Sequence, residues 1–232
     1  MSAFYDAIVE ENRRGYVAII PDIKYQSPKE GNLMAGRDPL DISRILVKNG
    51  APVLSMVTEK ERFGGDNIPF AAIADLGVPV LRKDFFTGAE SVEETKNMGA
   101  SAMLLIYATM NHNILNRIYD KALALGLEPL VETHTDDEMK LAAALRPKPK
   151  LIGINNRNIA SFEMDDGGVS HTAQLASRVP VGSLLISESG IHTPEDVKQA
   201  VKAGANAVLV GTALLQAQDI AAFYQSLRIK IS

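Results

Sequence analysis

Two charged side chains stand close together near the start of the chain, in the stretch IPDIKYQSPKEG at residues 20–31. If this stretch is a strand, Asp22 and Lys24 point to the same face, because side chains alternate along a strand. A carboxylate and an amine would then share one small region just before a turn. Such a pair can exchange protons with a substrate, or it can be a plain structural ion pair.

Other polar residues follow apolar runs in the same way. Lys83 ends one run in LRKDFF, Glu132 ends another in LVETH, and Asn155 and Arg157 follow a third in GINNRN. Charged side chains are seldom buried unless they are paired. Amines and carboxylates gathered in one place give acids and bases of different strength. These residues predict an acid–base site, provided that the fold brings them together.

Several other polar residues near these motifs are interpreted as structural and not as parts of the site. Arg82 faces away from Lys83 and is the better candidate for a structural ion pair. The run TEKER at residues 58–62 is interpreted as a solvated charge run, and His134 as a loop residue near a helix start. The remaining histidines are scattered, and none is assigned a catalytic or metal-binding role.

The elements that must position the site are short apolar runs, each followed by a helix-like stretch. Eight such runs occur, and they are too apolar for half-exposed antiparallel strands, so we expect parallel strands buried on both faces. They lie at residues 16–20, 52–57, 78–82, 102–107, 128–132, 151–154, 184–187 and 207–211. Eight βα units predict a (β/α)8 TIM barrel. The competing doubly wound sheet lacks support, because no G-x-G-x-x-G motif follows the first strand.

The whole chain is expected to form one barrel domain. We expect a helical segment over residues 1–16, the barrel over residues 17–217 and a C-terminal helix over residues 218–232. Active-site residues of such barrels come from the carboxyl ends of the strands. The acidic, basic and amide residues named above all fall there, so they should converge on one mouth.

The last two strand ends predict an anion site. In these barrels the loops after strands seven and eight often bind phosphate together with a short extra helix. Gly190 and Gly211 would let backbone N–H groups approach an anion, and GTALL at residues 211–215 can begin a helix. Arg157 could pair with a second anionic group.

Composition excludes several classes of function. The net charge is −4 and no basic block is present, so we expect no nucleic-acid partner. The chain has no cysteine, which excludes disulfides and thiolate chemistry. No signal-like or membrane-spanning apolar run occurs, so we expect a cytoplasmic protein that binds no membrane. No large apolar stripe is evident, and we expect a monomer.

Taken together, these motifs resemble the indole-3-glycerol-phosphate synthase family over nearly the whole chain. The stretch DIKYQSPKEG resembles the family's E-I-K-x-x-S-P-S-x-G, and TEKERFGG resembles its T-x-x-x-x-F-x-G. The segments VPVLRKDF, LVETH, IGINNRN, SESGI and LVGTALL follow in the family's order. The related phosphoribosylanthranilate isomerases share the phosphate end but not this series.

The resemblance implies a lyase of tryptophan biosynthesis that needs no cofactor or metal. Its substrate would be 1-(2-carboxyphenylamino)-1-deoxyribulose 5-phosphate, and its products indole-3-glycerol phosphate, carbon dioxide and water. Lys83 matches the general acid of ring closure. Lys24 and Glu132 match the groups that serve the later dehydration, Asn155 would orient a hydroxyl and Glu132, and Asp22 would tune Lys24.

The resemblance also implies a set of substrate-binding residues. Phe63 and Phe85 match the apolar positions that hold the anthranilate ring, and Lys24 and Arg157 suit the substrate's carboxylate. Ser189, Gly190, Gly211 and Thr212 match the phosphate-binding loops. Two more residues within the matching motifs, Ser27 and Glu188, are expected to bind substrate.

Three departures from the family's pattern bear on turnover. Asp22 stands where the family has Glu, and its shorter side chain withdraws the carboxylate by about 1.5 Å, on the scale of one carbon–carbon bond. Pro21 lies inside the first strand, where proline removes a ladder donor, so we expect a bulge that re-aims Asp22. The N-terminal extension, which helps to cover the mouth, is shorter in the sequence as given.

Two kinds of alternative remain open. One is a different reaction on the same site, such as Schiff-base chemistry at a strand-end lysine. The other is a degenerate or substrate-shifted homologue that binds a related phosphorylated substrate.

Overall fold

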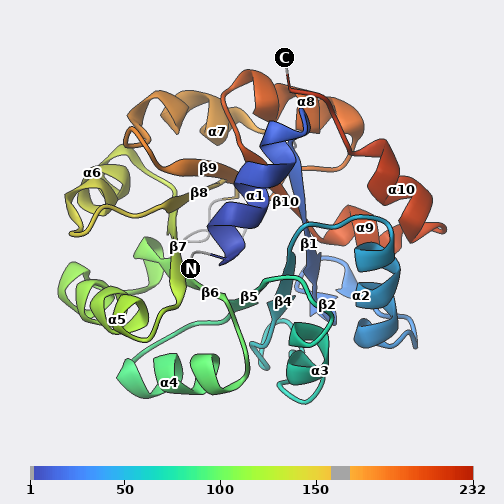
Figure 1. The fold of residues 1–232 in the computed structure, drawn as a ribbon, viewed down its shortest axis with the longest axis horizontal. Coiled ribbons are helices and arrows are strands. Elements are labelled where there is room, and N and C mark those ends of the chain that lie inside the picture. The colour runs from blue at the N-terminus through green and yellow to red at the C-terminus, as the bar shows by residue number, and fades with distance from the viewer. Residues whose placement is uncertain (1–2, 158–167, 232) are drawn as a thin grey trace.

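The computed structural model describes residues 3–157 and 168–231 of the chain. Eight parallel strands close into one ring in the order β1-β10-β9-β8-β7-β6-β5-β4 (Figure 1). They are β1 (Ala18–Ile23), β4 (Leu54–Val57), β5 (Val80–Lys83), β6 (Ala102–Ile106), β7 (Glu128–Thr133), β8 (Leu151–Asn155), β9 (Leu184–Glu188) and β10 (Ala207–Val210). Because β1 pairs with both β10 and β4, this sheet has no free edge. The predicted (β/α)8 barrel is confirmed, and the doubly wound sheet is excluded.

All of the labelled helices except the first, α1, surround the ring of strands on the outside (Figure 1). Their capping follows the sequence: Pro39 and Pro194 occupy the first turn of α2 and α8, and Asp38 and Thr193 accept the first amide bonds. The helices are α1 (Ala3–Arg13), α2 (Pro39–Lys48), α3 (Phe70–Ala74), α4 (Ala89–Asn97), α5 (His112–Ala124), α6 (Asp136–Ala144), α7 (Ser170–Leu175), α8 (Pro194–Lys202), α9 (Thr212–Gln216) and α10 (Ile220–Ser226). The described residues also contain the 3-10 turns Tyr107–Thr109 and Ala176–Arg178 and a hairpin of β2 (Gln26–Ser27) and β3 (Gly31–Asn32).

Side chains of each strand divide between two apolar cores. In β1, Ala18 and Ile20 belong to the core inside the barrel, whereas Ile19 and Ile23 belong to the core between barrel and helices. This is the two-residue alternation of a strand. The same parity carries Asp22 to the inside, near the carboxyl end of the strand.

Helix α1 closes the amino-terminal end of the barrel. It crosses the centre of the ring of strands (Figure 1), and its Phe4 and Ile8 are fully buried in the inner core. The Glu128 carboxylate, at the start of β7, accepts the amides of Phe4 and Tyr5 at 2.7 and 3.0 Å. These contacts satisfy orphan amides of the first helical turn. Helix α1 therefore lies at the end opposite to the mouth.

The C-terminal segment differs from the expected helix over residues 218–232. Helix α10 ends at Ser226, and the chain then runs back along the segment that precedes β1. The amide of Val17 donates to Ile229 at 3.1 Å, and the amide of Ile231 donates to Gly15 at 2.9 Å. These tertiary hydrogen bonds replace the helical ones.

None of the helices in the described residues is long and apolar enough to span a membrane.

Replacing Phe4 with alanine should lower the free energy of unfolding by about 3–5 kcal/mol, because a buried aromatic side chain leaves a cavity at the barrel floor. Urea denaturation followed by circular dichroism measures this loss. The exposed Glu10→Ala change on the same helix serves as the control and should stay within about 0.5 kcal/mol of the parent. A loss below about 1 kcal/mol for Phe4→Ala would contradict the role of α1 as a plug.

Candidate active site

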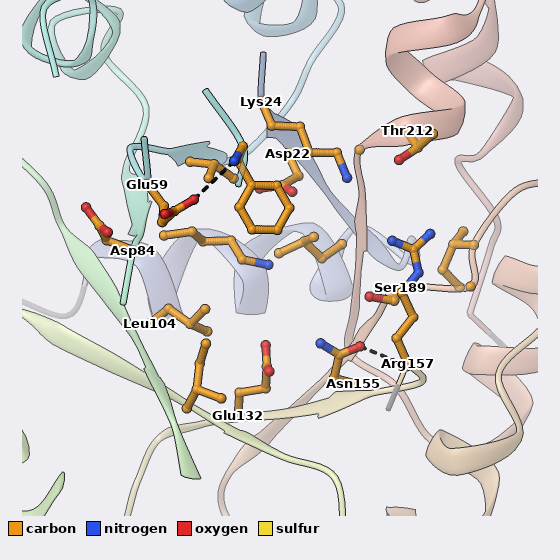
Figure 2. Close-up of a pocket in the computed structure, with 18 of the residues that line it drawn as sticks. Asp22, Lys24, Glu59, Asp84, Leu104, Glu132, Asn155, Arg157, Ser189 and Thr212 are labelled. Atoms are coloured by element: carbon orange, nitrogen blue, oxygen red, sulfur yellow. Dashed lines mark hydrogen bonds between the residues drawn. The ribbon is translucent and has the colours of Figure 1, made fainter. Parts of the chain in front are cut away.

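A cavity opens at the carboxyl ends of the strands and gathers most of the residues singled out from the sequence. Figure 2 shows Asp22 and Lys24 on one side of it, and Glu132 and Asn155 on the other. Twelve of the fourteen expected site residues line this cavity: Asp22, Lys24, Phe63, Lys83, Phe85, Glu132, Asn155, Arg157, Ser189, Gly190, Gly211 and Thr212. The other two, Ser27 and Glu188, lie outside its wall.

Asp22 is fixed by a neighbouring strand. Its carboxylate Oδ1 accepts a hydrogen bond of 2.6 Å from the hydroxyl of Ser55, the residue that it pairs with on β4. The expected bulge at Pro21 is wrong, because the register with β10 runs evenly from Ala18 to Pro21 and passes to β4 at Asp22. Ser55 therefore sets the direction of the Asp22 carboxylate. The simple Asp22–Lys24 ion pair is not what holds this carboxylate.

Lys24 is a buried cation beside the cavity. Only 7% of the residue is exposed. Burial lowers the pKa of Lys24 to about 8, opposed by Asp22 and reinforced by the positive charges of Arg157 and Lys83. Three cations thus face one cavity, and an anionic ligand there would relieve their repulsion.

Lys83 lies among carboxylates instead. Its Nζ is 3.1 Å from Oε2 of Glu188, which is completely buried behind it. Burial opposes the ammonium form, but the charges of Glu188, Asp22 and Glu132 outweigh burial and raise the pKa of Lys83. Burial and the nearby Glu132 carboxylate in turn raise the pKa of Glu188, while Lys83 opposes them. Glu188 was expected to bind substrate, but its described partner is Lys83.

Glycine makes this arrangement possible. Gly153 of β8 stands directly against the Glu188 carboxylate, and a Cβ at that position would overlap it.

Ser27, the other residue outside the wall, accepts the amide of Glu30 at 3.0 Å and shapes the turn after β2.

Arg82 and Lys83 separate as the strand alternation predicts. Arg82 is buried on the helix side, 2.9 Å from Glu94 and 3.1 Å from Asp84. Its guanidinium also donates to Thr58 at 2.9 Å. The structural role expected for Arg82 is confirmed. Its neighbour Lys83 points to the cavity instead.

The charge run at residues 58–62 is not simply solvated. Glu59 is 9% exposed and lines the cavity. Its carboxylate accepts the amides of Glu61, Arg62 and Phe63 at 2.9–3.1 Å. Glu59 therefore organises the loop that places the Phe63 ring, a role hidden in the sequence because its neighbours Lys60 and Glu61 are exposed.

An apolar wall completes the cavity beside Phe63 and Phe85. Half of the lining residues that sequence reasoning missed are inward-facing strand positions, namely Val57, Leu104, Ile106 and Leu209. The other half, Glu59, Asp84, Ile191 and His192, come from loops. Strand parity would have found the first four, because each lies an even number of residues from an inner-core position.

The end of the cavity that is expected to bind phosphate contains two residues with unusual backbone conformations. Ser189 and Gly190 have φ angles of +63° and +71°, in the left-handed region. A Cβ at Gly190 would collide with the carbonyl of Gly168. The amide group of Asn156 donates to the carbonyls of Glu188 and Ser189 at 2.9 and 3.1 Å. Asn156, also missed from the sequence, thus holds this loop open toward the cavity.

Chemically, the cavity combines an aromatic wall, a cationic region, a carboxylate opposite it and a backbone anion loop. Those features define a barrel enzyme that moves protons on an anionic, partly aromatic substrate. Within the described residues, no three His, Asp or Glu side chains are arranged to hold a metal ion.

Comparison with known proteins agrees with this class. The family model described as indole-3-glycerol phosphate synthase matches residues 1–227, and the chain belongs to that family. The synthase of Pyrococcus furiosus is 45% identical over 203 residues, covering 87% of each chain. The synthase of Shouchella clausii is 43% identical over 204 residues, covering 88% of this chain and 78% of the relative.

This membership confirms the resemblance drawn from the motifs and the expected class of enzyme, a lyase of tryptophan biosynthesis. It does not favour the degenerate or substrate-shifted alternative.

Replacing Lys24 with methionine should stabilise the free protein at pH 7. The pKa falls from 10.5 to about 8, so the folded state disfavours the ammonium by up to about 3 kcal/mol at 1.36 kcal/mol per unit. Below pH 8 both states are charged and this penalty is complete. Between pH 8 and 10.5 the folded state sheds the proton first, so the penalty shrinks.

Urea denaturation at pH 7 and near pH 10.5 measures this effect. The advantage of Lys24→Met should be largest at pH 7 and nearly absent at the higher pH. Lys29→Met, at an exposed site in the same loop, is the matched control. A methionine variant less stable than the parent at pH 7 would contradict the burial penalty.

Proposed function

We propose that this chain converts 1-(2-carboxyphenylamino)-1-deoxyribulose 5-phosphate to indole-3-glycerol phosphate, carbon dioxide and water. The observation that carries the proposal is the pairing of two lysines in opposite environments on one cavity. Lys24 is desolvated and shares the cavity with two other cations besides the Asp22 carboxylate, whereas Lys83 is surrounded by carboxylates. One lysine is suited to hold an anion, and the other to remain an ammonium that donates a proton.

Lys83 serves the ring closure. The aromatic carbon that bears the carboxylate attacks the ketone carbon, and the carbonyl electron pair moves to oxygen. The Lys83 ammonium donates a proton to that oxygen, which becomes a hydroxyl. The carboxylates around Lys83 keep it protonated until then, and the developing alkoxide is a stronger base than an amine.

Loss of carbon dioxide follows, as the bond to the carboxylate breaks and its electron pair restores the ring. The new hydroxyl must then leave as water, which needs an acid for the oxygen and a base for a substrate proton. Glu132 and Lys24 are the groups for this step, on opposite sides of the cavity (Figure 2). Asn155 lies beside Glu132 and can orient the hydroxyl between them.

Binding uses the ends of the cavity. The backbone loop at Ser189 and Gly190, with Gly211 and Thr212 at the start of α9, takes the phosphate. Lys24 and Arg157 take the anthranilate carboxylate, and the rings of Phe63 and Phe85 hold its aromatic ring. The partial desolvation of Lys24 supports this role, since the bound carboxylate offsets the burial of its charge.

The oligomeric state, location and cofactor requirement of the protein are also proposed. We propose a monomer acting in the cytoplasm. We propose no cofactor or metal, because Lys83, Lys24 and Glu132 supply the acids and bases of the steps above.

Purified protein given the synthetic substrate should release a product with indole fluorescence, against a low background because the chain has no tryptophan. Lys83→Ala should reduce kcat by about 10²–10⁴-fold, the usual contribution of a general acid. Lys140→Ala, an exposed lysine on α6, is the control and should keep full activity. Undiminished product from Lys83→Ala would remove Lys83 from the mechanism.

The pH profile of kcat/KM should fall above pH about 8, where Lys24 in the free protein loses its proton. A bound carboxylate favours the ammonium, so the corresponding fall in kcat should lie at higher pH. Steady-state rates between pH 6 and 10.5 measure both profiles. A flat kcat/KM profile up to pH 10, or coincident limbs in the two profiles, would count against carboxylate binding by Lys24.

A further inference from the structure

The imidazole of His134 lies between two carboxylates just outside the cavity. Its Nε2 is 3.4 Å from Oε1 of Glu132, and its Nδ1 is 3.4 Å from Oε2 of Glu138. Only 9% of the His134 side chain is exposed. The ring is therefore enclosed in a line of three titratable groups that ends at a proposed catalytic carboxylate.

Local structure fixes this line. His134 directly follows β7, and Thr135 caps α6 by accepting the amide of Glu138 at 3.2 Å. The Glu138 carboxylate reaches back and accepts the backbone amide of His134 at 2.6 Å. The same carboxylate oxygen thus accepts the main-chain amide of His134 and lies 3.4 Å from Nδ1 of its ring.

Among the described residues, the charged groups that act most strongly on the ring are acidic. These groups are Glu132 from β7, Glu138 from α6 and Glu188 from β9. A neutral imidazole can donate from only one nitrogen, whereas the imidazolium donates from both. Burial alone would lower the pKa of His134, but the close Glu138 carboxylate and the charges of Glu132 and Glu188 raise it overall.

A cation at this position would offset the repulsion between two buried carboxylates of the site. Glu132 and Glu188 are both buried and close, and two such carboxylates tend to share a proton. Lys83 offsets this from the cavity side through Glu188. His134 is the residue next to Glu132 on the side of α6 that can supply a positive charge, since its neighbours raise its pKa.

We propose that His134, held by Glu138, is a positioning residue that keeps the Glu132 carboxylate ionised and oriented for the dehydration step. The inference rests on the proposed function, because the role of Glu132 belongs to that proposal. Without the imidazolium, the Glu132 carboxylate would lose an opposite charge and a neighbour that lies 3.4 Å away.

The kinetic test is the acid limb of the pH profile of kcat/KM. His134→Gln should move that limb upward by about 1 pH unit, the low end of the effect of an opposite charge at this range. We expect kcat at pH 6–7 to fall about 10-fold, with KM little changed, because Glu132 acts on a bound intermediate. Titration of the substrate itself cancels in the comparison with the parent.

Glu138→Gln separates charge from structure, because its amide oxygen can still accept the backbone amide of His134. It should shift the limb in the same direction but less far. The double variant should match His134→Gln alone, because Glu138 acts through the ring. The control His112→Gln removes an imidazole that pairs with the Tyr107 hydroxyl at 3.2 Å and should leave the profile unchanged.

An unshifted acid limb in His134→Gln, or an equal loss at every pH together with a lower melting temperature, would overturn the proposal in favour of a helix-anchoring role. Additive shifts in the double variant would overturn it as well.

A second readout needs no activity and so separates this inference from the proposed function. The chain has four histidines, and the NMR signal of His134 is identified by its loss in His134→Gln. Its titration midpoint should lie above 6.5 in the parent and fall in both Glu132→Gln and Glu138→Gln. A normal midpoint that neither substitution moves would overturn the inference even if the synthase activity is present.

Discussion

The alternation of side chains along eight parallel strands governs the rest of this structure. Closure of the ring leaves each strand with one face on the axis and one on the helices. Along β5, that rule sends Arg82 to the helices and Lys83 to the axis, although the two are adjacent. A slip of one residue in one strand would exchange such neighbours and empty part of the site. The site is therefore specified by strand register before any loop is considered.

Burial of charge distinguishes the two ends of the barrel. At the floor, Phe4 and Ile8 of α1 fill the axis, and the Glu128 carboxylate is used for helix capping. At the mouth, Lys24 is buried and has a lowered pKa, a condition that favours a ligand more than it favours the free fold. The packing at the floor thus stabilises the fold, whereas the buried charge of Lys24 at the mouth destabilises it. Such a local loss of stability is common at functional sites.

Much of the fold and the site could be predicted from the sequence, because apolar runs and the rule that strand ends carry active-site residues are both local signals. What could not be predicted depends on contacts between distant segments. The hydroxyl of Ser55 that directs Asp22 belongs to another strand, and it replaces the bulge expected at Pro21. The hydrogen bonds of residues 229–231 with residues 15–17 end the last helix early, and no local propensity announces them. The contact of Glu188 with Lys83 is of the same kind, since it spans 105 residues.

The close packing around Asp22 is best understood through Gly211. A Cβ at Gly211 would stand 3.2 Å from both the Asp22 carboxylate and the Cε of Lys24, and 3.1 Å from the Asp22 carbonyl. Glycine there serves two needs, because it also begins the α9 segment expected to meet phosphate. The other oxygen of the Asp22 carboxylate accepts the Ser55 hydroxyl at 2.6 Å. The acid–base region and the anion loop are therefore packed against each other through one missing side chain, so a change at either is constrained by the other.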